Sequence, residues 1–314
     1  MMRTFLTDSP EEAAGYIRRG GVVAFPTETV YGLGAAVFDE RAVAAIYEAK
    51  MRPADNPLIA HIAEIGQIAE LASEITEQAR RFIDAFFPGP LTIVLRKSDR
   101  VPLIATAGLD TIGIRMPGFE LSQRFLKECG TPVVAPSANL SGRPSPTTWR
   151  AVHEDLDGRI DCILRGNPTD IGLESTVVDC TGDVPVVLRS GSVTLAELRR
   201  VIPSTIMPDI DSSEAPRSPG LKHRHYSPAA SVEIVPHAAD AHPGDRAAFI
   251  GMERPDRAFE SVLICQSVDE YAREVFEFFR ECDRKGVEKV YCQSVAEDGI
   301  GTALMDRLRR ASRG

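Results

Sequence analysis

The sequence predicts an α/β protein with a large, twisted, mixed β-sheet, followed by a second and smaller α/β unit. Short β-branched runs bounded by Gly, Pro and Asp alternate with helical segments along most of the 314 residues, and this alternation is typical of α/β folds. From about residue 203 to 228, however, Pro and Ser are dense and apolar periodicity is absent. A stretch of this composition is typical of a linker and indicates two domains.

The first elements follow from local chemistry. A helix should begin near Pro10, capped by Asp8 or Ser9, and end at Gly20. The apolar run GVVAFP predicts a buried strand, and the Thr- and Gly-rich PTETVYGLGA after it predicts a loop. A second helix is expected from about residue 39 to 50, before a strand at PLIAHI and a helical stretch to about residue 87. Further strands are expected at LTIVLR, TIGIRMP, TPVVAP, STVVDC and VPVVLR, with helices near residues 119–129, 148–156 and 194–201.

The C-terminal part has a different pattern. SVEIVP, RAAFIG, SVLICQ and KVYCQS read as short parallel-type strands that alternate with helices at about 268–284 and 301–311. This order is typical of a small Rossmann-like, doubly wound unit. We therefore expect a first domain at 1–203, a linker at 204–229 and a C-terminal domain at 230–314.

Charge and composition exclude several classes of protein. The net charge is −9, whereas a protein that grips duplex nucleic acid is usually basic, although a local basic groove stays compatible with this charge. No stretch approaches the ~20 apolar residues of a membrane span, and the N-terminal region lacks the apolar core of a signal peptide. We expect a cytoplasmic protein without membrane contact.

Cysteine and histidine do not indicate a metal site. The six cysteines are scattered singly, unlike a disulfide framework or a zinc ribbon, and most lie in apolar stretches where a small buried thiol is expected. His223 and His225 form a close pair, but no Cys or carboxylate lies beside them to complete a metal site. No metal ligands are assigned.

A first group of polar residues points to an anionic ligand. In KMRPADNPLIAH, Lys50 and Arg52 lie two apart where a helix must end, and Asn56 and His61 follow around a Pro-bounded turn. Like charges at a rigid turn favour an anion between them, and Arg offers a planar fork suited to phosphate. The alternative is that both cations complement the C-terminus of the helix.

A second group lies in APSANLSG. Ser137 and Asn139 stand where a strand opens into a loop, the usual position of ligand groups in α/β sheets. Gly142 lets a ligand approach the backbone closely. The alternative is a turn stabilised by the Ser and Asn side chains.

A third group is dispersed along the chain. Thr27, Thr29, Arg115, Ser175 and Arg189 each stand at the end of an apolar run, so that one concavity could collect them, although a cap or an edge position explains each one equally well. The usual nucleotide motifs do not explain them. The chain has no GxxxxGK[ST] phosphate loop, and the G-I-G before the last expected helix lacks the third glycine of a dinucleotide motif.

Taken together, the motifs resemble one family. PTETVYGLG, KxRPxxNPLxxH, GIRMP, PSANxSGxPSPT, ESTVVD and LRSG occur in this order between residues 26 and 191, and this order resembles the threonylcarbamoyl-AMP synthases, the YrdC-like proteins, in their long two-domain form. The linker phrase SPGLKHRHYSP and the closing GxGxALMDRLRRA resemble the long form as well. The resemblance therefore covers nearly the whole chain and implies a YrdC-like first domain.

The resemblance implies a reaction. The amine of L-threonine takes up bicarbonate or CO2 as a carbamate, the carbamate oxygen attacks the α-phosphate of ATP, and pyrophosphate leaves with Mg²⁺, which would come with ATP rather than with protein ligands. The product, threonylcarbamoyl-adenylate, would pass to a tRNA threonylcarbamoyl transferase complex that modifies tRNA next to the anticodon. Because the carbamate is the nucleophile, the protein would act by positioning and by stabilising charge, with Lys50 and Arg52 as the catalytic cations.

The resemblance also implies binding residues. Those for ATP are Lys50, Arg52, Asn56, Thr111, Ser137, Asn139, Ser145, Arg189 and Tyr226. Those for threonine are Thr29, His61, Arg115, Ala135 through its backbone, and Ser175. Arg115 would pair with the threonine carboxylate. Tyr226 belongs to the linker, which would fold over the cavity as a lid and exclude water.

Two alternatives remain open. A carbamoyl-transfer component, as in hydrogenase maturation, would need acylphosphatase and zinc-finger segments, and this chain has no CxxC. An RNA- or nucleotide-binding module without turnover would use the Arg-rich tail for a weak contact with tRNA, although a solvated helix end explains the tail more simply and the acidic balance disfavours such a module. The tail residues are Arg307, Arg309, Arg310 and Arg313.

Overall fold

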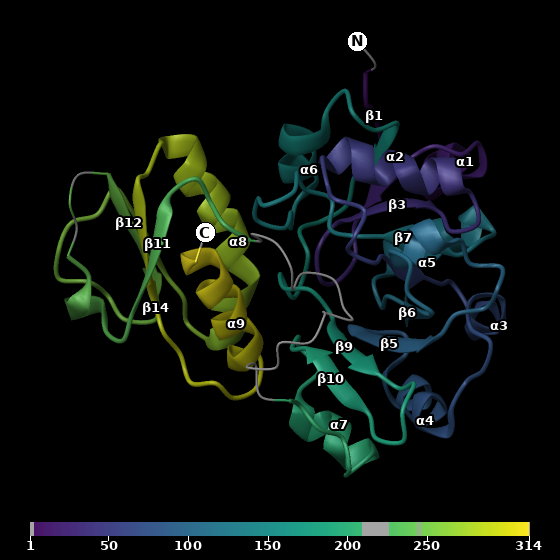
Figure 1. The fold of residues 1–314 in the computed structure, drawn as a ribbon. Helices are drawn as coiled ribbons and strands as arrows, with labels where there is room; N and C mark the ends of the chain where they lie inside the picture. The colour runs from purple at the N-terminus through teal and green to yellow at the C-terminus, as the bar shows by residue number, and fades with distance from the viewer. Residues whose placement is uncertain (1–2, 209–225, 243, 245, 314) are drawn as a thin grey trace.

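The computed structural model describes residues 3–208, 226–242, 244 and 246–313. These residues form two sheets, one of ten strands and one of four. Helices α8 (Val268–Lys285) and α9 (Gly301–Ser312) lie between the small sheet and the large domain (Figure 1). The predicted fold class, a mixed α/β domain followed by a small doubly wound one, is confirmed.

The large sheet is mixed. Its strands are β1 Phe5–Thr7, β2 Val23–Phe25, β3 Gly32–Ala36, β4 Ile59–His61, β5 Leu91–Arg96, β6 Thr111–Arg115, β7 Val133–Ala135, β8 Cys162–Leu164, β9 Thr176–Asp179 and β10 Val186–Arg189. They lie side by side in the order β1, β8, β2, β3, β7, β4, β6, β5, β9 and β10. The pairs β1–β8, β8–β2, β4–β6 and β5–β9 are parallel, and the other neighbours are antiparallel. Several strands that are distant in sequence are therefore neighbours in the sheet.

The helices of this domain begin where the sequence supplies caps. They are α1 Pro10–Arg18, α2 Glu40–Lys50, α3 Ile68–Leu71, α4 Glu77–Phe86, α5 Glu120–Cys129, α6 Trp149–Leu156 and α7 Leu195–Val201, with 3-10 turns η1 Ile65–Gln67 and η2 Leu103–Thr106. The side chains of Ser9, Asp39, Thr76, Thr148 and Thr194 accept hydrogen bonds from N–H groups of the first turn of their helices. Of the two caps proposed for the first helix, Ser9 is the one used.

Three strands were not predicted. β3 lies in the Thr- and Gly-rich segment that we expected to be a loop. A Cβ at Gly34 would lie 2.6 Å from Val133 and 2.9 Å from Phe25, so this glycine serves close packing within the sheet rather than a turn. β1 and β8 have three residues each and were missed, although β2, β4 and β7, which are equally short, were predicted from their apolar runs.

The small sheet is wholly parallel. Its strands lie in the order β11 (Ser231–Val235), β14 (Lys289–Gln293), β12 (Ala247–Gly251) and β13 (Ser261–Ile264), and the short η3 (Ala238–Asp240) follows β11. The four apolar runs named from the sequence thus form the four strands.

The domain boundaries at 203/204 and 229/230 stay predictions, and most of the linker lies outside the described residues.

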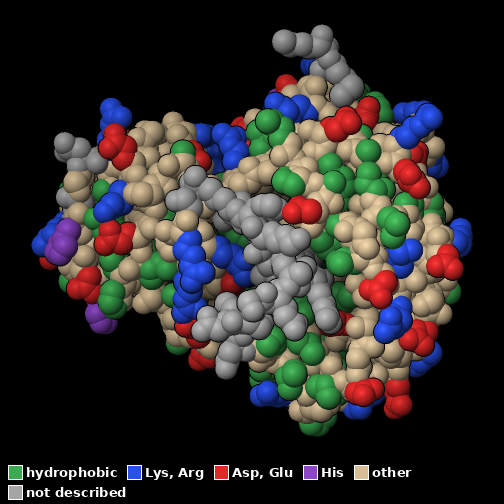
Figure 2. Space-filling view, viewed as in Figure 1, with side chains coloured by type: hydrophobic (Ala, Val, Ile, Leu, Met, Phe, Trp, Pro, Cys, Tyr) green, Lys and Arg blue, Asp and Glu red, His purple; other side chains and the backbone are tan. Residues whose placement is uncertain are grey.

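The cysteines, the groups that could bind a metal ion and the surface charges can now be placed in the fold. All six cysteines are buried and unpaired, which confirms the expected buried thiols. In the described part of the chain no group of His, Cys, Asp and Glu is arranged to hold a metal ion, and His223 and His225 lie outside it. No described helix has the length and apolarity to cross a membrane. Acidic and basic side chains are mixed over the visible face of the large domain (Figure 2).

The two domains interlock at residues 172–174. Gly172 has a φ of +81°, and a Cβ there would lie 2.4 Å from the Cα of Arg273 on α8. Leu173 belongs to the apolar cluster of the C-terminal domain. Glu174 forms an ion pair with Arg307 of α9 at 2.9 Å. Arg307 is only 1% exposed, so the expectation that the whole Arg-rich tail is solvated was wrong for this residue, because the tail helix turns this face toward the large domain.

Candidate active site

A cavity lies in the large domain, with about 670 Å³ of empty space that includes the part open to solvent. Its walls come from the loop after β2, the turn after α2, the ends of β4, β6, β7 and β10, and the loop after β7. Most of the predicted site residues line it, namely Thr29, Arg52, His61, Arg115, Ala135, Ser137, Asn139, Ser145, Ser175, Arg189 and Tyr226. Lys50, Asn56 and Thr111 do not.

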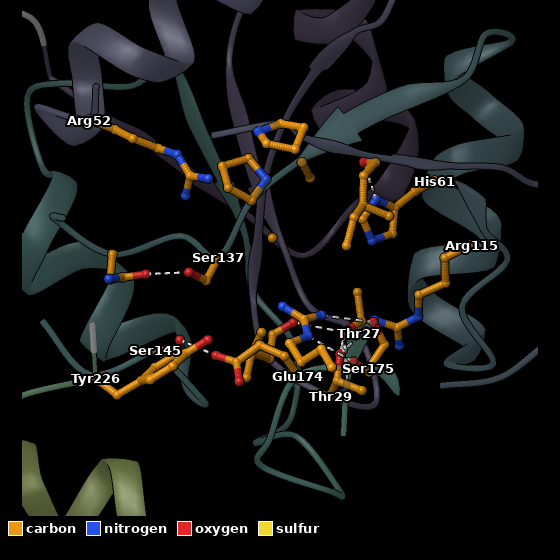
Figure 3. Close-up of a pocket in the computed structure, with 18 of the residues that line it drawn as sticks. Thr27, Thr29, Arg52, His61, Arg115, Ser137, Ser145, Glu174, Ser175 and Tyr226 are labelled. Atoms are coloured by element: carbon orange, nitrogen blue, oxygen red, sulfur yellow. Dashed lines mark hydrogen bonds between the residues drawn. The ribbon is translucent and has the colours of Figure 1, made fainter. Parts of the chain in front are cut away.

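The lining residues fall on two sides. Figure 3 shows Arg52, Ser137, Ser145 and Tyr226, all predicted for ATP, on one side of the cavity. The other side carries the residues predicted for threonine, namely Thr29, His61, Arg115 and Ser175. These four residues of the ATP set are thus separated from these four of the threonine set.

Lys50 stabilises the loop that follows β7 rather than lining the cavity. Its Nζ donates to the backbone oxygens of Ser137 and, at 2.6 Å, Asn139, and lies 3.4 Å from Asn139 Oδ1. Burial, together with the neighbouring Arg52, lowers the pKa of Lys50. Because its donors face protein oxygens, Lys50 orders the loop from behind.

Arg52 faces the cavity from the turn after α2. Its Nη2 donates to the backbone oxygen of Asn56 at 3.2 Å, whereas its Nε is buried and has no hydrogen-bond partner within the described part of the chain. An unpartnered donor in a cavity wall is typical of a group that waits for a ligand. Asn56 is itself buried beneath this turn. Thr111 lines a second, smaller cavity of about 270 Å³ that shares Pro57 and Ile59 with the first.

Arg115 is held in a fixed orientation. Its Nη1 donates to Thr29 Oγ1 at 2.7 Å and its Nε to the backbone oxygen of Gly89 at 3.2 Å. Its Nη2 lies 2.8 Å from a carboxylate oxygen of Glu28. These partners leave part of the guanidinium free to bind a carboxylate.

Ser175 and Arg189 form a second fixed pair on this side. Arg189 donates from Nε to the backbone oxygen of Ser175 at 3.0 Å and from Nη2 to its hydroxyl at 3.2 Å. The Ser175 hydroxyl also lies 2.8 Å from that of Thr92. Arg189, predicted for ATP, therefore reaches the residue predicted for threonine.

His61 is a neutral group. Burial, assisted by the charge of Arg115, lowers the pKa of His61 to about 3. Its Nδ1 donates to the backbone oxygen of Ile59 at 3.1 Å. In a neutral ring the other nitrogen, Nε2, is then a hydrogen-bond acceptor, so His61 offers an uncharged acceptor.

Two charged lining residues, Arg143 and Glu174, were missed from the sequence. Arg143 pairs with Asp155 at 2.5 Å, and Glu174 accepts a hydrogen bond from Ser145 at 2.5 Å. Glu174 directly precedes Ser175 in the ESTVVD motif, and that position was the available signal. Its other partner, Arg307, is 133 residues away.

Two family models match the chain. Residues 15–191 match the Sua5/YciO/YrdC model, described as telomere recombination, and residues 193–313 match the model of the threonylcarbamoyl-AMP synthase C-terminal domain. The threonylcarbamoyl-AMP synthase of Pyrococcus abyssi is 46% identical, covering 96% of this chain and 93% of the relative. This chain belongs to the threonylcarbamoyl-AMP synthase family.

Two further members of the threonylcarbamoyl-AMP synthase family are similar to this chain over nearly its whole length. The enzyme of Bacillus subtilis is 41% identical over 98% of this chain and 94% of its own length. The crystal structure of P. abyssi Sua5 complexed with L-threonine superposes with a TM-score of 0.89 at 41% identity, covering 100% of this chain and 98% of that one. The family resemblance read from the six ordered motifs is confirmed.

Proposed function

We propose that this chain is a threonylcarbamoyl-AMP synthase, which condenses L-threonine, bicarbonate or CO2, and ATP to threonylcarbamoyl-adenylate and pyrophosphate. The two-sided cavity carries the proposal. One side presents a cation and hydroxyl groups suited to phosphates, and the other presents a fixed guanidinium and a neutral imidazole suited to an amino acid.

On the amino-acid side, Arg115 would bind the threonine carboxylate with the N–H groups that its protein partners leave over. Nε2 of His61 would accept a hydrogen bond from the threonine hydroxyl or amine. Thr29, Ser175 and the backbone of Ala135 complete this side. Because His61 carries no charge, it does not repel the ammonium form of the amine or pair with the carbamate.

On the nucleotide side, the reaction needs charge stabilisation rather than a nucleophilic side chain. The carbamate oxygen forms a bond to the α-phosphorus as the bond to the bridging oxygen breaks, and pyrophosphate leaves. Arg52 and Arg189 would stabilise the developing charge, and Ser137, Asn139 and Ser145 would donate to phosphate oxygens. Lys50 would contribute by ordering the loop that carries two of these residues.

Mg²⁺ would enter as part of the substrate, bound to the phosphates of ATP. Glu174 is the carboxylate among the described lining residues, and it is occupied by Ser145 and Arg307. The phosphates of ATP would therefore supply most of the ligands of this metal ion.

The linker would act as a lid. Residues 209–225 lie outside the described residues, but Tyr226 at the end of this segment lines the cavity and stacks on Phe276 of α8 at 5.5 Å. Water hydrolyses both the carbamate and the mixed anhydride, so a cover over the cavity would protect them.

The product would then pass to a tRNA threonylcarbamoyl transferase complex. A weak direct contact with tRNA and a cytoplasmic location stay predictions.

The direct test is pyrophosphate release from ATP and Mg²⁺, measured with L-threonine and bicarbonate together and with each of them omitted in turn. Release that requires both threonine and bicarbonate is expected. ATP binding without such release, in folded protein, would instead support the alternative of a nucleotide- or RNA-binding module without turnover.

A further inference from the structure

Arg307 joins three walls of the cavity although it belongs to the C-terminal domain. From α9 its Nε donates to Glu174 at 2.9 Å and its Nη2 to the backbone oxygen of Ser190, next to Arg189, at 3.0 Å. Its guanidinium carbon lies 5.4 Å from the centre of the Tyr226 ring. Arg307 itself does not line the cavity, but each of these segments does.

We propose that Arg307 is a positioning residue of the active site. It neutralises Glu174 and orients it toward Ser145, so that the C-terminal domain sets the affinity of the nucleotide side of the cavity. This inference rests on the proposed function, because it gives a part in that function to the C-terminal domain, from which the reaction chemistry itself requires no residue.

The charge of Glu174 makes a partner necessary. A buried carboxylate in a wall that must receive the phosphates of ATP would repel them, and a buried charge without a partner is strongly destabilising. Burial alone would raise the pKa of Glu174, but the guanidinium groups of Arg307 and Arg189 and the Ser145 hydroxyl hold it below its ordinary value. The ionised carboxylate therefore persists and depends on these cations. Tyr226 also faces Glu174. Asp306 pairs with Arg307 at 2.7 Å and with Arg310 at 2.9 Å.

The orientation of Glu174 is also set by the C-terminal domain. Gly172 packs against the backbone of Arg273, and Leu173 is fully buried in the apolar cluster of that domain. Glu174 follows directly, and Ser175 begins the threonine side. Three consecutive residues thus dock on α8 and α9 immediately before the residue that contacts Arg189.

The experiment compares R307Q with the double variant E174Q/R307Q in the full-length chain. R307Q leaves the Glu174 carboxylate short of a cation, so the KM for ATP and the calorimetric Kd for MgATP should rise about 10- to 100-fold, with a much smaller change in the KM for threonine. The double variant removes the carboxylate as well and should recover most of this loss. R307K, which keeps the charge, should lie between wild type and R307Q.

The matched control is R284Q. Arg284 also pairs across the domain interface, with Glu154 at 3.1 Å, but both side chains are about two-fifths exposed and neither lines the cavity. R284Q should keep the KM for ATP of the wild type. This variant separates loss of an interdomain ion pair in general from loss of the pair at Glu174.

A pH series supplies a readout that a purely structural role would not change. In R307Q the affinity for MgATP should improve as the pH falls from 8 to 5.5, because protonation of Glu174 removes the repelling charge, whereas E174Q/R307Q should lack this difference. Equal impairment and equal pH dependence of the two variants would overturn the inference. A wild type that binds MgATP but releases no pyrophosphate would overturn the proposed function alone, since the Kd values still test Arg307.

Discussion

Lys50 and Arg52 lie two residues apart, and their side chains point to different tasks. Lys50 donates to oxygens of the loop after β7, whereas Arg52 faces the cavity with an unpartnered Nε. Two cations at the end of a helix predict a bound anion nearby. Their spacing does not show which of the two side chains contacts that anion. That distinction depends on the loop at Ser137–Asn139, about 87 residues further along the chain.

Variants of these two residues should therefore fail in different ways. R52A should slow the reaction by roughly 10²–10³-fold, as expected for loss of one preorganised cation, with little change in melting temperature. K50M should lower the melting temperature by roughly 5 °C or more, because the backbone oxygens of Ser137 and Asn139 lose a donor, and should slow the reaction through the disordered loop.

Both effects are measured by steady-state kinetics and thermal melting of the same preparations. R41A, on the exposed start of α2, is the control for removal of a cation from this helix. A loss of twofold or less in R52A would return Arg52 to the alternative of a helix-capping cation.

Other residues of the site were predictable to different extents. The sequence indicated Arg115, Ser175 and Arg189 because each stands at the end of an apolar run, and His61 because it follows Lys50 and Arg52 around a Pro-bounded turn. It did not indicate Glu174, because its role depends on a partner in the last helix. It also could not show that His61 is uncharged, since this follows from burial.

At the scale of elements, the segment 172–174 joins the two domains. Gly172 and Gly108 have nearly the same positive φ, +81° and +82°, but only a Cβ at Gly172 would meet another segment, whereas nothing lies within 4 Å at Gly108. Both Gly→Ala variants should show the strain of a positive φ. G172A should in addition push α8 away from the large domain.

We therefore expect G172A to lower the melting temperature more than G108A and also to raise the KM for ATP. G108A should keep the KM for ATP of the wild type. Thermal melting and ATP titrations of the two variants check this, and equal behaviour in both assays would show that the contact with Arg273 is unimportant.

Helices were easier to predict than strands for physical reasons. Most helices of the large domain begin at a capping side chain, which is a local signal. β3 was mistaken for a loop because the packing that requires Gly34 comes from Val133 on another strand. The strands of the C-terminal domain were predicted well because each contains a short apolar run, and the two central strands, β12 and β14, are buried parallel strands.

At the scale of the whole molecule, buried ion pairs link the domains. Asp155 pairs with Arg280 of α8 at 2.9 Å, and Glu174 pairs with Arg307. Burial alone would raise the pKa of Asp155, but Arg280 and Arg143 hold it below its ordinary value of 3.8, and Glu174 lies below its ordinary 4.5. When the pKa of a carboxyl group is lower in the folded than in the unfolded chain, its ionised form stabilises the fold fully at any pH above the unfolded-state pKa. This stabilisation is lost as the pH falls through the folded-state pKa.

The titration of Asp155 and Glu174 should therefore leave the melting temperature unchanged between pH 8 and about pH 5. Below about pH 4 their protonation should lower the melting temperature. The variant D155N/R280Q lacks one of the two pairs and should lose part of this acid dependence. Melting curves at closely spaced pH values check the expectation. An acid transition of the same depth and midpoint in both proteins would assign it to other carboxylates.

The position of Leu173 limits where the chain can be cut into separately folding fragments. This residue of the large domain is fully buried in the apolar cluster of the C-terminal domain. A C-terminal fragment that begins in the linker would lack it and would present an uncovered apolar hollow to water. The second domain is therefore not a self-contained module: recombination that exchanged it between relatives would have to preserve a side chain more than fifty residues upstream.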